Sequence, residues 1–322
     1  MISKLLYSSL IILTSVNKCE NNVSPTTSDN VINNTKQVVK IDSINDNNKN
    51  NNYSLHLENI QAITNNIGEY TNPVWSPDGK KILYTSTGYN NLYYYDIDSK
   101  TSYTLLDVND VGYNANWSID SKSIYYRVKK YSENKKSYFE VYSIDIDTKK
   151  SQLQSDINPD GIKSYSQAID SESPIIFINT KTLKVEAETV NKKKKWIITN
   201  DEGQFYNPIL SPDKMKVLTH RGSDMLIFSS DGSGIISNIG VGIGCSWSRD
   251  NKKILYFLDE SSNGEQITGS ELYLINIDGT NKQNLTNTDD MIEMYPMFSP
   301  DNSKIVFSDE KTRNIYIADF IK

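Results

Sequence analysis

The chain of 322 residues has very few of the side chains on which metal sites and nucleophilic catalysis most often depend. It contains two histidines, His56 and His220, and two cysteines, Cys19 and Cys245. Two cysteines exclude a disulfide framework, and with two histidines they leave too few ligands for a Cys- or His-rich metal site. Catalysis by a histidine general base is a narrow possibility for the same reason. The composition therefore favours a protein that binds over one that catalyses.

Basic charge, long apolar runs and turn-forming residues are also scarce. Lys and Arg total 34 against 40 Asp and Glu, so the net charge is −6, and the pI near 5.1 argues against a nucleic-acid binder. A mean hydropathy of −0.54 excludes a polytopic membrane protein. The 15 glycines and 9 prolines are few for a loop-rich chain. The length suits one large domain or two.

The first 18 residues have the pattern of a signal peptide for export. A positive charge in residues 1–4 is followed by an apolar segment over 5–16, which is too short for a bilayer core that needs about 20 residues. A buried N-terminal helix is the alternative. Residues 19–54 are rich in asparagine and have no aromatic residue before Tyr53, so we expect a disordered linker there.

Cys19 lies at the junction of these two segments, where bacterial lipoproteins carry their lipid-modified cysteine. Residues 13–19 loosely resemble a lipobox, although Asn17 and Lys18 stand where small residues are expected. The resemblance implies a lipid anchor at Cys19, since each buried methylene adds about 0.8 kcal/mol of membrane affinity. It places the protein in the periplasm or at the outer membrane or cell surface. Cleavage by an ordinary signal peptidase is the alternative.

A repeated Trp-Ser-Pro-Asp-Gly pattern occupies the rest of the chain. Clear copies start at Trp75, Trp117, Leu210, Trp247 and Phe298, and a worn copy places Gln167 in the Trp position. The starts recur every 37 to 51 residues, which is the period of β-propeller blades. We therefore expect residues 55–322 to be an all-β, six-bladed propeller.

Each repeat predicts four strands, with a tight turn after the Trp position. Third strands are expected over 92–97, 138–146, 183–189, 225–229, 271–277 and 314–320. The sixth repeat has no fourth strand of its own, but residues 58–64 resemble residues 279–286 of the fifth. We expect this N-terminal strand to complete the last blade, because closure of the ring removes exposed sheet edges.

The copies resemble the repeats of TolB-like propellers, a WD-repeat-like family also related to the propeller domains of prolyl-oligopeptidase relatives. The resemblance covers residues 55–322 and implies the propeller fold. It does not extend to the N-terminal α/β domain of TolB, and the Gly-His and Trp-Asp signature of eukaryotic WD repeats is missing. A role like that of TolB in the envelope is an analogy that the resemblance suggests.

Tyrosines recur in the loops before the first strands, which share one face of a propeller with the loops between second and third strands. They are Tyr70, Tyr113, Tyr165, Tyr206 and Tyr295. An aromatic ring around this mouth would stack on sugars or peptide side chains. Packing of these tyrosines between blades is the alternative. Arg221 is a further contact candidate on this face, together with Tyr89, Arg127 and Asp259.

Three other features carry weaker expectations. His220 is expected to be a polar residue of the mouth, and Cys245 a buried, unreactive thiol. Carboxylates gather near the last two blades at Asp289, Asp290, Glu293, Asp309 and Glu310. They are oxygen ligands that suit Ca²⁺, but a solvated acidic loop is favoured, and no cofactor is expected.

The function favoured by these patterns is that of an exported, lipid-anchored, monomeric scaffold that binds an envelope protein or peptide without catalysis. A glycan-binding module that uses the mouth tyrosines is the alternative. A third hypothesis is a polysaccharide lyase resembling the propeller-type oligogalacturonate lyases. Their His-rich metal site argues against it here, since the chain has only two histidines.

Overall fold

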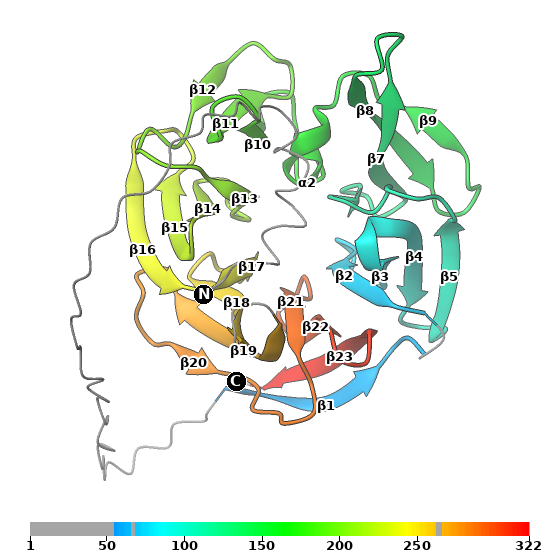
Figure 1. The fold of residues 1–322 in the computed structure, drawn as a ribbon, viewed down its shortest axis with the longest axis vertical. Helices are drawn as coiled ribbons and strands as arrows, with labels where there is room; N and C mark the ends of the chain where they lie inside the picture. Colours follow the sequence, from blue (N-terminus) through cyan, green and yellow to red (C-terminus); the bar gives the residue numbers. More distant parts are fainter. Residues whose placement is uncertain (1–54, 66–67, 262–265, 322) are drawn as a thin grey trace, which may run out of the picture.

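The computed structural model of the protein describes residues 55–65, 68–261 and 266–321. These residues form six separate antiparallel sheets that stand around a central axis (Figure 1). The prediction of an all-β, six-bladed propeller is therefore confirmed. The predicted signal peptide over 1–18, the linker over 19–54 and Cys19 lie outside the described residues.

In four of the blades, four consecutive strands of the chain neighbour one another in chain order. Blades 1 and 2 consist of β2 (Tyr70–Trp75), β3 (Lys81–Ser86), β4 (Asn90–Asp96), β5 (Thr101–Leu106), β6 (Asn116–Trp117), β7 (Ser123–Tyr131), β8 (Ser137–Asp145) and β9 (Ser151–Leu153). Blades 4 and 5 consist of β13 (Tyr206–Leu210), β14 (Lys216–Arg221), β15 (Asp224–Ser229), β16 (Ile235–Val241), β17 (Ile243–Trp247), β18 (Lys253–Ser261), β19 (Ile267–Asn276) and β20 (Gln283–Asn284). A 3₁₀ turn, η1 (Thr87–Tyr89), precedes β4.

Blade 6 is built from both ends of the described chain. It consists of β21 (Glu293–Phe298), β22 (Lys304–Asp309), β23 (Asn314–Ile321) and β1 (His56–Ala62), with β1 antiparallel to β23. Thr64 fastens the end of β1, since its Oγ1 accepts a hydrogen bond from Ile315 N at 2.9 Å and donates one to Asn314 Oδ1 at 3.0 Å. The prediction that an N-terminal strand completes the last blade is confirmed, with the strand two residues earlier than expected.

Blade 3 departs from the predicted pattern. It has three strands, β10 (Pro174–Asn179), β11 (Lys184–Thr189) and β12 (Lys195–Ile197). The place of a first strand is taken by a 3₁₀ turn, η2 (Pro159–Gly161), and a short helix, α2 (Ile162–Tyr165). The expectation of four strands in every repeat, with Gln167 in the Trp position, is therefore wrong for this repeat.

Local hydrogen bonds explain why a helical turn replaces the strand. The Oδ1 of Asn158 accepts a hydrogen bond from Asp160 N at 3.0 Å, and Pro159 has the fixed φ that suits a first helical position. Ser164 then satisfies the edge of β10, because its Oγ accepts from Ile176 N at 2.9 Å and donates to Ile176 O at 3.2 Å. One side chain thus makes bonds that a first strand would have made.

The other five blades share one turn between their first and second strands. In blade 1, Ser76 Oγ donates to Asp78 Oδ1 at 2.6 Å, the same oxygen accepts from Lys80 N at 3.0 Å, and Ser76 Oγ accepts from Lys81 N at 2.8 Å. The same three bonds recur in the turns that begin at Ser118, Ser211, Ser248 and Ser299. The repeated Ser-x-Asp sequence is therefore a self-contained turn.

The residue after each of these aspartates has a left-handed backbone, with φ between 59° and 71°. The five residues are Gly79, Ser121, Lys214, Asn251 and Asn302. Glycine and asparagine adopt this conformation readily, whereas Ser121 and Lys214 are residue types that rarely do. The left-handed conformation costs a non-glycine residue about 1–2 kcal/mol, and the hydrogen bonds of the turn offset that cost. The propeller can therefore be built with few glycines.

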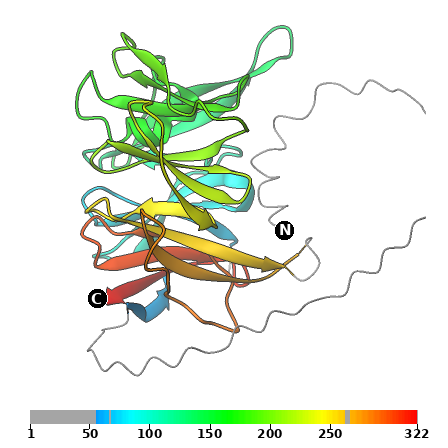
Figure 2. The same cartoon turned by 90° about the vertical axis from the view of Figure 1, so that its left-hand side faces the viewer.

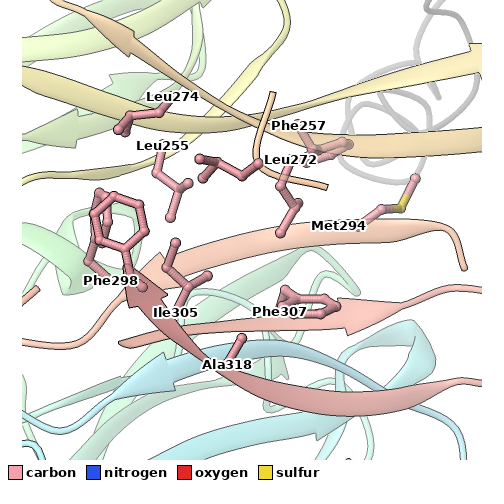
Figure 3. Packing of buried hydrophobic residues seen from close by; sticks show 11 residues of the cluster. Leu255, Phe257, Leu272, Leu274, Met294, Phe298, Ile305, Phe307 and Ala318 are labelled. Atoms are coloured by element: carbon pink, nitrogen blue, oxygen red, sulfur yellow. The ribbon is translucent and has the colours of Figure 1, made fainter. Parts of the chain in front are cut away.

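The hydrophobic core lies between neighbouring sheets. Figure 3 shows the largest cluster, in which Leu255 and Phe257 of blade 5 face Ile305 and Phe307 of blade 6. Tryptophans of the repeat add hydrogen bonds across such interfaces, since Trp117 Nε1 donates to Val74 O at 3.0 Å. Each blade is therefore held by its neighbours.

Candidate functional site

The mouth face of the propeller is formed by two sets of loops, those before the first strands and those between second and third strands. The opposite face, here called the turn face, carries the Ser-x-Asp turns. The hairpins β7–β8 and β18–β19 have the longest strands of the ring and project beyond the other blades on the mouth side (Figure 2). They belong to blades 2 and 5, which lie opposite each other in the ring (Figure 1).

Tyr113 belongs to a fixed aromatic and charged cluster at the mouth. Its ring lies edge-on to Tyr89, with centroids 5.2 Å apart. The guanidinium of Arg127 lies 4.0 Å from the ring centroids of both Tyr113 and Phe139, and its Nη1 is 3.1 Å from Asp160 Oδ1. Burial raises the pKa of Tyr113, so its hydroxyl is protonated at neutral pH. The cluster joins the loops of blades 1, 2 and 3.

Tyr206 forms a second part of the mouth. Its ring stacks on His220 with centroids 5.0 Å apart, and its hydroxyl donates to Gly222 O at 2.7 Å. Beside it, Arg221 Nη1 donates to Glu202 O at 3.2 Å. Both residues therefore present partly exposed side chains at the mouth end of blade 4.

His220 is a buried structural residue, which corrects the expectation of a polar mouth residue. Its side chain is completely buried, and its Nε2 accepts a hydrogen bond from Gly244 N at 2.9 Å. Burial lowers the pKa of His220 to about 4, so the imidazole is neutral at physiological pH. The stack with Tyr206 covers it on the mouth side. His220 is placed to support the mouth and not to act on a ligand.

Tyr295 belongs to the first strand of blade 6, which runs beside the central axis (Figure 1). It sits in β21 with φ of 52°, and its ring packs edge-on against Phe257 at 5.4 Å. Its pKa is raised well above the ordinary value, by burial first and then by the nearby Tyr89, on the next blade, with a smaller contribution from Asp259 of blade 5. The hydroxyl therefore lies within electrostatic reach of groups from blades on both sides of it. Burial likewise raises the pKa of the neighbouring Cys245 to about 12, so its thiol is protonated.

Two of the five predicted tyrosines are placed differently from the other three. Tyr70 packs edge-on against Tyr84 and Tyr93, with centroids 5.3 and 5.5 Å apart, in the cluster between blades 6 and 1. Tyr165 lines a pocket with Ser118 and Asp120 on the turn face. Tyr165 thus lies on the turn face, and Tyr70 packs between blades, as in the alternative to the ring, although it is partly exposed. Tyr113, Tyr206 and Tyr295 remain.

Lys163 is a polar residue of the central region that the sequence analysis missed. It lies in α2, where burial lowers its pKa, and its charge acts on both His220 and Cys245. No ion pair joins it to a residue of the described ranges. The only signal for it was the Asn158-Pro159 helix start, because a lysine in an expected strand carries no marker of its own.

The carboxylates near blades 5 and 6 are divided between surface and core. Asp289 and Asp290 are exposed, whereas Glu293 and Asp309 are completely buried, so a solvated acidic loop describes only part of the set. Glu293 Oε1 accepts from Thr288 Oγ1 at 2.9 Å, and its Oε2 has no hydrogen-bond partner. Burial is the main cause that raises the pKa of Glu293 to about 7. Within the described ranges, no three His, Cys, Asp or Glu side chains are arranged to hold a metal ion.

Comparison with known proteins gives the fold. No family model and no curated protein matches the chain. A putative TolB from Agrobacterium tumefaciens is 16% identical with a TM-score of 0.49, over 84% of this chain and 99% of that one. TolB from Acinetobacter baumannii is 17% identical with a TM-score of 0.35, over 78% of this chain and 54% of that one.

Two further propeller structures have slightly higher TM-scores. The β-propeller domain of Cps50 (Swd1) from Myceliophteria thermophila is 10% identical with a TM-score of 0.51, over 80% of this chain and 98% of that one. The WD40 repeats of RRP9 are 7% identical with a TM-score of 0.51, over 81% and 97%. At these identities the likeness establishes the propeller fold alone. In the part of the chain that the structure describes, no helix is long and apolar enough to cross a membrane.

Proposed function

We propose that the chain is exported and lipid-anchored at Cys19, and that its propeller is a non-enzymatic scaffold that binds a protein or peptide of the cell envelope. The observation that carries this proposal is the partly exposed aromatic surface of the mouth, where Tyr89, Tyr113 and Tyr206 are held in place by ring contacts. Tyrosines that are already fixed lose little entropy on binding and are typical of energetically dominant residues in protein interfaces.

The protonation states of His220 and Cys245 support binding over catalysis. A nucleophile or general base needs a pKa near the working pH and access to its substrate. His220 is neutral and buried, and the Cys245 thiol is protonated. Neither group meets both conditions. The same burial of His220 argues against the His-dependent site of a polysaccharide lyase.

A glycan is the alternative ligand for the mouth. Sugars stack on free ring faces, but one face of Tyr113 is covered by Arg127 and one face of Tyr206 by His220. Each ring therefore offers one face at most, and Tyr113 and Tyr206 are on different blades. This arrangement favours a peptide, which can reach several small contacts along its length.

Affinity capture from the native envelope tests the proposal. We expect the immobilised protein to retain an envelope protein, identified by mass spectrometry, and the double variant Tyr206→Ala with Arg221→Ala to retain at least tenfold less of it. These two residues lie together at the mouth, and their removal leaves the Arg127 cluster intact. Tyr103→Ala, on the outer strand β5, is the control with a tyrosine that is 41% exposed. Equal capture by the double variant and by the wild type would contradict the mouth-face assignment, and dependence on added glycan would favour the alternative.

Lipid anchoring predicts a second, separate result. Cys19→Ala should move the protein from the membrane pellet to the soluble periplasmic or culture fraction, because the acyl chains supply its membrane affinity. Fractionation followed by immunoblotting measures this, with Cys245→Ala as the matched control for loss of a cysteine. Unchanged membrane partition of Cys19→Ala would refute the lipid anchor and leave the mouth-face proposal untouched.

A further inference from the structure

Among the residues that the structure describes, the interface between blades 2 and 3 has the smallest hydrophobic cluster. Three buried residues form it, Val141, Ile157 and Ile162, whereas the clusters of the other interfaces contain between six and eleven. Elsewhere the first strand brings a large side chain into the interface, as Trp247 does when its Nε1 donates to Ile209 O of blade 4 at 3.1 Å. Blade 3 has no first strand, so this side chain is missing.

A pocket of about 300 Å³ opens at that position on the turn face. Its walls include Tyr125 from β7 and Tyr165 from α2, whose rings meet edge to face with centroids 5.4 Å apart at 88°. Ile119 lies in its lining and is 51% exposed, and Ile169, between two lining residues, is 71% exposed. The pocket therefore combines aromatic walls with an apolar, solvent-facing rim.

Two carboxylates belong to the lining, Asp120 of the turn in blade 2 and Asp170 of the degenerate turn in blade 3. Their Oδ1 atoms are used within the turns, by Ser118 Oγ at 2.6 Å and by Ser173 Oγ at 2.9 Å. No residue within the described ranges donates a hydrogen bond to either Oδ2, and neither aspartate is in an ion pair there.

Both carboxylates are charged at neutral pH. The hydrogen bond from Ser118 is the main cause that lowers the pKa of Asp120. The hydrogen bond from Ser173 is the main cause that lowers the pKa of Asp170. Lys122 and Lys214 add a smaller electrostatic effect without forming an ion pair with either aspartate, and Lys214 Nζ donates a hydrogen bond to Ser173 Oγ at 3.2 Å. The lining thus carries negative charge beside two aromatic rings.

We propose that this pocket binds the cationic side chain of an arginine or lysine presented by a partner polypeptide. Aromatic rings attract a cation through their negative faces, and carboxylates form charge-assisted hydrogen bonds with guanidinium or ammonium groups. The exposed isoleucines give the stem of such a side chain an apolar surface to lie on. The site is on the face opposite the mouth and is independent of the function proposed above.

Titration of the intact protein with short peptides tests the proposal. The probes are acetyl-Gly-Arg-Gly-amide and acetyl-Gly-Lys-Gly-amide, and the neutral citrulline analogue of the first is the control of nearly equal shape. The δ1-methyl resonances of Ile119 and Ile169 report on the rim. We expect saturable shifts with a cationic peptide at a Kd on the order of 1 mM, and at least tenfold weaker binding of the citrulline peptide. Equal shifts with citrulline, or no saturable shift with either cationic peptide, would overturn the proposal.

The repeat supplies a matched set of variants. Asp120→Asn and Asp170→Asn keep an oxygen for the turn but remove the charge, and each is expected to weaken binding at least threefold. Asp301→Asn makes the same change in the same turn of blade 6, whose first strand is present, and is expected to leave the affinity unchanged. Weakening by Asp301→Asn as large as that by Asp120→Asn would show a general electrostatic effect and would also overturn the assignment.

Discussion

A chain that begins at residue 65 is expected to melt at least about 10 °C below a chain that begins at residue 54. The first lacks β1 and leaves the edge of β23 unpaired, whereas the second keeps every residue that the structure describes. Each lost strand hydrogen bond costs about 0.5–1.5 kcal/mol, and Leu57, packed against the cluster between blades 5 and 6, adds about 1.5 kcal/mol. Five residue pairs join β1 to β23, so the lost bonds and the contact of Leu57 together cost roughly 5 kcal/mol. Each kcal/mol lowers the Tm by about 2–4 °C in a domain of this size.

Differential scanning calorimetry of the two chains measures this difference. The peptide of residues 54–65 provides a positive test, because strand addition to an open sheet edge can occur in trans. We expect it to restore most of the lost Tm in the short chain and to have no effect on the longer one. Equal melting temperatures for the two chains would show that ring closure by β1 does not stabilise the propeller.

The repeated turn could be predicted from the sequence because its determinants are local. Ser76 and Asp78 lie within three residues and make the bonds that define the turn, so the pattern alone specifies it. The closing strand could also be predicted, since residues 58–64 resemble a fourth strand and the last repeat lacks one. In both cases the residues of one short segment are enough to predict its local structure.

The candidate sites were predicted less well because they depend on contacts between blades. The Asn158-Pro159 helix start alone does not show that the blade of Tyr165 lacks a first strand, since that also depends on the bonds of Ser164 to β10. Tyr70 precedes its repeat in the same way as Tyr206, but the rings of Tyr84 and Tyr93 hold it in the packing between blades 6 and 1. The direction of a side chain at a strand end is decided by the facing blade.

The stability of the protein is expected to fall as the pH rises from about 5 to 8, and Glu293 is expected to cause much of that fall. Its carboxyl is buried next to Glu271 and Asp309, and its pKa is raised to about 7 in the folded protein. Its ordinary value in the unfolded chain is 4.5. Below that value the group is protonated in both states, so its contribution to stability is fully present. Above about pH 7 the folded protein must hold a buried charge, and the contribution is lost.

Comparison of the wild type with Glu293→Gln isolates this effect. One pKa unit corresponds to about 1.4 kcal/mol, so the free energy of unfolding of the wild type should fall by on the order of 3 kcal/mol more than that of the variant between pH 5 and pH 8. Glutamine keeps an oxygen that can accept from Thr288 Oγ1 and has no charge to bury. The aspartates of the Ser-x-Asp turns have lowered pKa values, about 2 at Asp301, so their titration changes the stability only at a pH below 5.

Chemical denaturation at both pH values measures the two unfolding free energies, with Glu133→Gln on the exposed tip of the β7–β8 hairpin as the control for loss of a carboxylate. A control that behaves like the wild type and a Glu293→Gln protein that is nearly indifferent to pH would establish the buried carboxyl as the cause. If Glu293→Gln kept the full pH dependence, the proton would have to be held elsewhere among the buried acids. Glu293 is the first residue of β21, the strand that also carries the mouth residue Tyr295, so the titrating carboxyl and this tyrosine share one strand.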